Sequence, residues 1–152
     1  MPGWKIHTKW SRKMRIPDDV AEHTNKVIDA WKLGNSPEDF LRYVCSKQYL
    51  ARLLRMFEVI HDLRKFKREV LPYFRMRGED YVRAWYLHHL LDYLVKLRDW
   101  MKNTGESTKK CIDKYKKNKA VTLYDTEKQL IEVMDFLKNS TQQLQKDLDL
   151  PN

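Results

Sequence analysis

The residues best suited to metal or acid-base chemistry in this sequence are its five histidines and the carboxylates near them. Two histidines are adjacent in the segment AWYLHHLLDYL, residues 84–94, which is otherwise apolar and aromatic. His88 and Asp92 are four residues apart, so they share one face of a helix. Burying histidine or aspartate without partners is costly. These groups therefore either bind a metal or are satisfied by tyrosine hydroxyls, backbone carbonyls or each other.

A second imidazole and carboxylate pair occurs at His61 and Asp62, and His23 follows Glu22 in an amphipathic segment. Imidazole nitrogens and carboxylate oxygens are the expected ligands of Zn, Mn, Fe and Ni. A helical bundle can hold such an ion with side chains that project inward from several helices. The composition therefore permits a divalent-metal site (Mn, Fe, Ni or Zn) spread over three helices.

Two of these segments resemble motifs of the HD-domain phosphohydrolases. EHTNKV, residues 22–27, is similar to the first histidine motif of that family, and EVIHDLRK, residues 58–65, resembles the motif that names it. The 37 residues between His23 and His61 are also similar to the family spacing. The resemblance implies an all-helical fold in which His23, His61 and Asp62 bind a divalent ion near the bundle core.

The resemblance extends over about residues 22–92 and leaves the rest of the ligand set open. In the family, a further aspartate on a later helix completes the site, and Asp92, Asp113 and Asp125 all qualify here by position. Extended HD families add histidines, a part that His88 or His89 could take. One departure is Arg64, which stands where the family usually has a small residue.

A metal at such a site would lower the pKa of bound water and supply hydroxide near neutral pH. Basic side chains would hold an anionic substrate and stabilise the transition state. We therefore predict hydrolysis of a phosphate ester or nucleotide. His88 or His89 would act as general acid, and Lys65 is a further predicted catalytic residue. The expected phosphate-binding residues follow the His-Asp pair: Arg64, Lys67 and Arg68.

A structural interpretation stands beside each of these assignments. His23 could lie at the surface. His61 and Asp62 are adjacent, so a helix turns them about 100° apart; they need not face one site, and Asp62 could pair with an arginine. His7, in WKIHTKW, is interpreted as a surface group or as part of an aromatic anchor.

Two basic and aromatic segments favour an alternative function, a non-catalytic module that binds nucleic acid or a protein partner. They are WKIHTKWSRKMR, residues 4–15, and KKCIDKYKKNK, residues 109–119. Lysines contact phosphates, and aromatic faces stack on unpaired bases. The competing interpretations are a solvated lysine face and tryptophans that fasten the N-terminal segment to the bundle. The candidate nucleic-acid residues are Trp10, Arg12, Lys13, Lys109, Lys110, Lys116 and Lys117.

Composition limits the class of protein. The formal charge of +9 and the pI of about 9.5 favour anionic partners, either a phosphate-containing substrate or nucleic acid. Cys45 and Cys111 have no CxxC spacing and are expected to be free thiols in a reducing compartment. Because no apolar run reaches the ~18 residues that a membrane span needs, we expect a cytoplasmic protein without a span.

The elements that must position these residues are helices. Pro17, followed by two aspartates, predicts a helix start, and Pro37 predicts another. Residues 79–103 are apolar nearly all round, which is typical of a central, enclosed helix. The sequence NTGEST ends that helix, and the lysine-rich segment then forms a short one.

The last predicted helix carries a single apolar seam from Leu130 to Leu148. This seam either closes the bundle or pairs with a second copy to make a homodimer. We predict an all-α, single-domain antiparallel bundle of five to six helices over residues 17–150, preceded by a basic and aromatic arm over residues 1–16.

Overall fold

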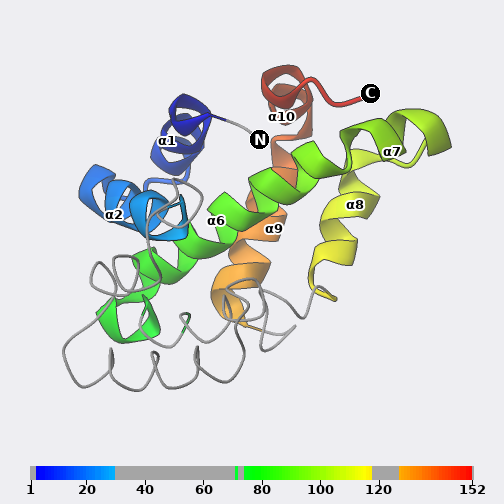
Figure 1. Ribbon diagram of the computed structural model, residues 1–152. Helices are drawn as coiled ribbons and strands as arrows, with labels where there is room; N and C mark the ends of the chain where they lie inside the picture. The colour runs from blue at the N-terminus through cyan, green and yellow to red at the C-terminus, as the bar shows by residue number, and fades with distance from the viewer. Residues whose placement is uncertain (1–2, 30–70, 72–73, 118–126, 152) are drawn as a thin grey trace, which may run out of the picture.

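The computed structural model describes residues 3–29, 71, 74–117 and 127–151, and each regular element in these ranges is an α-helix (Figure 1). This confirms the predicted all-α class. Residues 74–77 form a helical turn. The named helices are α1 (Trp4–Lys13), α2 (Asp18–Asp29), α6 (Glu79–Lys96), α7 (Arg98–Thr104), α8 (Thr108–Tyr115), α9 (Lys128–Asn139) and α10 (Thr141–Leu148).

These ranges already contain seven named helices, against the five to six predicted for the bundle, because the N-terminal segment predicted as an arm forms α1 and two predicted helices each divide in two. The helix expected over residues 79–103 breaks at Leu97, between α6 and α7. The last predicted helix breaks at Ser140, whose backbone departs from helical geometry between α9 and α10. The helix expected after Pro37 lies outside the described residues, apart from its buried end at Leu71.

Helix α6 is the centre of the fold, as its all-round apolar sequence predicts. It packs against α1, α2, α8 and α9, and Figure 1 shows it crossing the molecule between the α1–α2 pair and the α8–α9 pair. More than half of its residues are buried, including Trp85, Tyr86 and Leu90. Because α6 is enclosed on several sides, the polar side chains on its buried faces, His88, His89 and Asp92, are surrounded by protein.

The N-terminal segment folds back on this centre as a pair of helices. Ile16 is buried between α1 and α2, and Arg15 joins them in a left-handed backbone conformation at φ 60°. Helix α2 begins at Asp18, where Pro17 predicted a start. Arg12 donates both a Nε–H and a Nη2–H bond to the Asp18 carboxylate, each 3.0 Å long. Two contacts therefore stabilise this turn: the buried side chain of Ile16 and the ion pair between Arg12 and Asp18.

The apolar seam from Leu130 to Leu148 is buried within the chain. Its leucines at 130, 137, 144 and 148 are 3% exposed or less. Helices α9 and α10, which carry them, pack against α8, and α9 also packs against α6. The leucines of the seam therefore pack within the chain.

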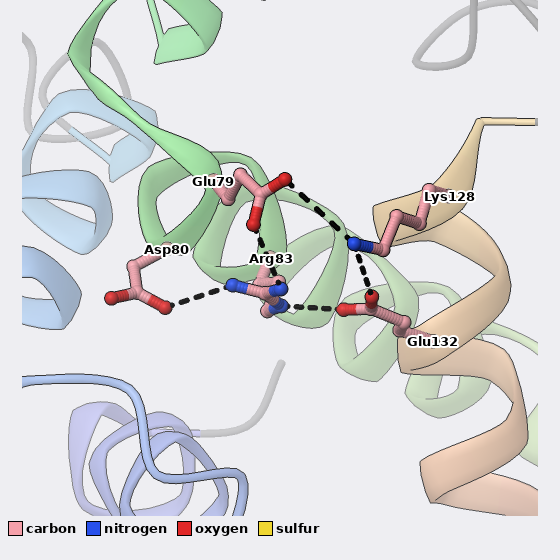
Figure 2. Close-up of polar contacts among 5 residues, drawn as sticks. All are labelled: Glu79, Asp80, Arg83, Lys128 and Glu132. Carbon is pink, nitrogen blue, oxygen red and sulfur yellow. Dashed lines mark hydrogen bonds and ion pairs between the residues drawn. The ribbon is translucent and has the colours of Figure 1, made fainter.

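A charged network ties α6 to α9 at the surface (Figure 2). The guanidinium of Arg83 contacts Glu79 and Asp80 on its own helix and Glu132 on α9, the last at 2.5 Å. Lys128 lies 3.8 Å from the same Glu132 carboxylate. The guanidinium thereby links two helices that are far apart in the sequence.

We expect the Arg83 and Glu132 side chains to couple by about 0.5–1 kcal/mol in a double-mutant cycle of alanine substitutions. The pair is only partly exposed and belongs to a network, so it should exceed the coupling of the exposed Lys102 and Asp149 pair, which are 3.5 Å apart. Urea unfolding of both cycles checks this. Equal coupling in the two pairs would contradict the expectation.

Among the residues that the structure describes, no helix combines the length and the apolar character needed to cross a membrane.

Candidate metal centre

Two helices bring two imidazoles and one carboxylate together in the core. His7 lies on α1, and His88 and Asp92 lie one turn apart on α6. Nε2 of His7 is 3.2 Å from Oδ1 of Asp92, and Nε2 of His88 is 3.5 Å from Oδ2. The predicted shared face of His88 and Asp92 is therefore confirmed, and the third member comes from a distant part of the chain.

All three side chains are buried. His7 and His88 are each 2% exposed and Asp92 is 6% exposed. A carboxylate in such surroundings is stabilised only by nearby positive charge or by hydrogen-bond donors. Here the two imidazole edges face its two oxygens.

A third helix orients one of these imidazoles. The side-chain oxygen of Asn25 on α2 lies 2.8 Å from Nδ1 of His88, and both residues are buried. Because a carbonyl oxygen only accepts, Nδ1 carries the proton and donates it to Asn25. This leaves Nε2 of His88, the atom that faces Asp92, to carry a lone pair or a second proton. Metal-binding histidines are commonly held in this way through the nitrogen that does not bind the ion.

The imidazoles of His7 and His88 are stacked, with centroids 3.9 Å apart and planes within 3° of parallel. The lone pair of a neutral imidazole lies in the plane of its ring. An ion that used both Nε2 atoms would therefore tilt the two rings out of parallel.

The donor set fits a divalent transition metal. The two imidazole nitrogens and the carboxylate oxygen lie within 4.8 Å of one another. Two histidines and one carboxylate also leave coordination positions open for water or substrate, as in catalytic zinc and non-haem iron sites.

The other two histidines of the described regions face different surroundings. His89 is buried with its ring edge-on to Trp85, at 4.4 Å between centroids. His23 is only partly buried and packs edge-on against Tyr81. Burial, followed by the charges of Arg77 and Lys26, lowers the pKa of His23 below its ordinary value. Neither histidine belongs to the group of three.

Several residues assigned from the sequence lie outside the described regions. They are the metal ligands His61 and Asp62, the alternative Asp125, and the catalytic or phosphate-binding residues Arg64, Lys65, Lys67 and Arg68. The third candidate for the closing aspartate, Asp113, is exposed and binds Lys138 through Oδ1 at 2.9 Å. Of the three aspartates, Asp92 is the one that faces imidazoles in the described structure.

Sequence reasoning missed His7 and Asn25. The interpretation of His7 as a surface group is wrong, since the side chain is buried. One local signal was present: His7 precedes Trp10 by three residues, which places both on one helical face. Because Trp10 is buried, His7 on the same face is buried as well. No local signal pointed to Asn25, because its role depends on the packing of α2 against α6.

The structure also places the candidate nucleic-acid residues. Trp10 is fully buried, so its ring offers no face to an unpaired base. Arg12 is exposed and bound to Asp18. The lysines at 13, 109, 110, 116 and 117 all lie at or near the surface. These lysines therefore remain accessible to phosphate groups, whereas Trp10 is not accessible for stacking on a base.

Comparison of this protein with family models, with curated proteins and with solved structures finds no match.

Proposed function

We propose that this protein binds a divalent transition metal through His7, His88 and Asp92, and uses it to hydrolyse a phosphate ester. The observation that carries the proposal is the convergence of two imidazoles and a carboxylate from α1 and α6 in the core. A group of this composition in a buried place costs folding free energy, which a bound cation would offset.

The hydrolytic part of the proposal is supported by the chemistry of the donor set and by charge. An ion with three protein ligands can bind water in an open position and lower its pKa. The net charge of +9 favours an anionic substrate. His89 is the candidate proton donor beside the site, since its ring centroid lies 5.8 Å from that of His88. The likeness of residues 22–65 to HD-domain motifs points to the same reaction class.

The metal content of the purified protein, and of variants at two aspartates, tests the first part. We expect near-stoichiometric Mn, Fe, Ni or Zn by elemental analysis, and its loss in Asp92→Asn, which keeps the side-chain shape but removes the charge. Asp113→Asn is the matched control, because Asp113 is exposed and binds a lysine. Retention of metal in Asp92→Asn, or no uptake of any of the four ions by the wild type, would overturn the site.

A further variant, Asp62→Asn, separates two ligand sets. If the HD-like pair contributes to the same ion, this variant also loses metal; if His7, His88 and Asp92 suffice, it retains the ion. Hydrolysis of bis(p-nitrophenyl) phosphate and p-nitrophenyl phosphate should follow metal content across all variants. Full metal occupancy with no hydrolysis of phosphate monoesters, diesters or nucleotides would contradict the catalytic part.

A further inference from the structure

A cavity of about 540 Å³ lies where the end of α1, the start of α8 and the junction of α9 and α10 meet. Its charged lining consists of four lysines: Lys13, Lys109, Lys138 and Lys146. The remaining lining is uncharged and polar, from Asn139 to Gln143. Four lysines from four helices therefore line one hollow whose lining contains no carboxylate.

The lysines differ in how far their charge is already compensated. Lys138 binds Asp113 at 2.9 Å and lies 3.6 Å from Asp135, so it is largely neutralised. Lys13 lies over the ring of Trp10, with Nζ 4.7 Å from the centroid. In the described regions, no carboxylate lies within ion-pair distance of Lys109 or Lys146. These two ammonium groups are consequently the ones most able to bind an external anion.

The start of α10 adds hydrogen-bond donors to the same cavity. Ser140 occupies the N-cap position but its side chain makes no capping hydrogen bond, and the Thr141 hydroxyl donates to the carbonyl of Lys138. The first backbone N–H groups of this helix are thus left without a side-chain cap. Exposed N–H groups and the positive end of the helix dipole both favour a negative ligand, and they support the lysines here.

We propose that this cavity binds a compact anion that carries two or more phosphate groups. Lysines from several helices around one cavity can contact several negative charges at once, and a cavity of this size accommodates an oligophosphate. The lining contains no aromatic side chain on which a base could stack, so recognition is directed at phosphates. The site lies on different side chains from the metal centre and does not depend on it.

Isothermal titration with sodium tripolyphosphate, ATP and adenosine, without added metal, tests this proposal. We expect tripolyphosphate and ATP to bind with similar Kd values that weaken with salt, and adenosine not to bind. The double variant Lys109→Gln/Lys146→Gln should weaken tripolyphosphate binding about tenfold or more, because it removes two charge-assisted contacts.

The matched control is Lys110→Gln/Lys117→Gln. It removes the same charge from exposed lysines of α8 and the residues that follow it, and neither lysine lines the cavity. This control should retain wild-type affinity. Equal weakening in both double variants would overturn the proposal in favour of unspecific attraction to a basic surface. Absence of tripolyphosphate binding by the folded wild type would also overturn it, and tighter binding of ATP than of tripolyphosphate would contradict recognition by phosphates alone.

Discussion

Replacing Trp10 by alanine is expected to lower the free energy of unfolding by about 4 kcal/mol, as for other fully buried tryptophans. The indole is 0% exposed, and its ring packs edge-on against Phe136 at 6.0 Å between centroids. Its Nε1–H donates to Oδ2 of Asp147 at 3.1 Å, so truncation leaves a cavity and also removes a donor from a carboxylate. Urea unfolding followed by circular dichroism measures the loss.

Two further substitutions separate packing from hydrogen bonding. Trp10→Phe keeps most of the ring and removes the N–H, so about 1–2 kcal/mol should be lost. Trp4→Ala is the matched control on the same helix, because Trp4 is 46% exposed, and it should change stability little. A Trp10→Ala variant that was as stable as Trp4→Ala but lost affinity for single-stranded nucleic acid would contradict this prediction. The Trp10 ring would then be accessible and would bind nucleic acid.

Replacing Glu127 by glutamine is expected to cost about 2 kcal/mol, within the range for charged hydrogen bonds. Glu127 precedes α9, and its side chain is 11% exposed. Arg75 binds both carboxylate oxygens, at 2.8 and 2.6 Å, and the hydroxyl of Tyr86 on α6 donates to one of them. This carboxylate therefore joins three segments, and the neutral amide removes its charge from all of those contacts.

The cost should depend on pH in a defined direction. Burial acts to raise the pKa of Glu127, but the hydrogen bonds from Arg75 and Tyr86 outweigh it and hold this pKa below the ordinary 4.5. A lowered pKa stabilises the folded chain above 4.5, and that stability is lost as the pH falls through the folded value. The difference between wild type and Glu127→Gln should therefore be full near neutral pH and shrink in acid.

The control for this prediction is Glu106→Gln. Glu106 binds Lys114 at 2.8 Å, but this lysine is half exposed and the pair does not join separate parts of the core. Denaturant unfolding at neutral and acidic pH should show a much smaller effect for this substitution. A Glu127→Gln effect that persisted unchanged in acid would contradict the assigned role of the ionised carboxylate.

The sequence suggested both cation binding and anion binding, and the structure offers a separate place for each. The group of His7, His88 and Asp92 suits a cation, and the lysine-lined cavity suits an anion. Two histidines and one aspartate gather in the core, where they could hold a cation. Lysines gather at the surface around the junction of α9 and α10, where an anion can enter. Each proposal has its own variants and probe, so failure of one leaves the other intact.

The sequence by itself determined the features that depend on local periodicity. The all-round apolar pattern of α6 predicted an enclosed helix, the proline and aspartates before α2 predicted its start, and the seam from Leu130 to Leu148 predicted a buried stripe. The shared face of His88 and Asp92 also follows from helical spacing alone. Residues within two turns of each other are related by backbone geometry, so these predictions needed no knowledge of packing.

Tertiary structure decided which distant residues meet. His7 and Asn25 join His88 only because α1 and α2 pack against α6, and Lys109 and Lys146 share a cavity only because α8 and α10 converge. Neither arrangement leaves a periodic signal in the sequence, since the separation along the chain does not fix the distance in space. The burial of Trp10 has the same origin: its neighbours in the sequence are basic, and its neighbours in space, Phe136 and Asp147, come from α9 and α10.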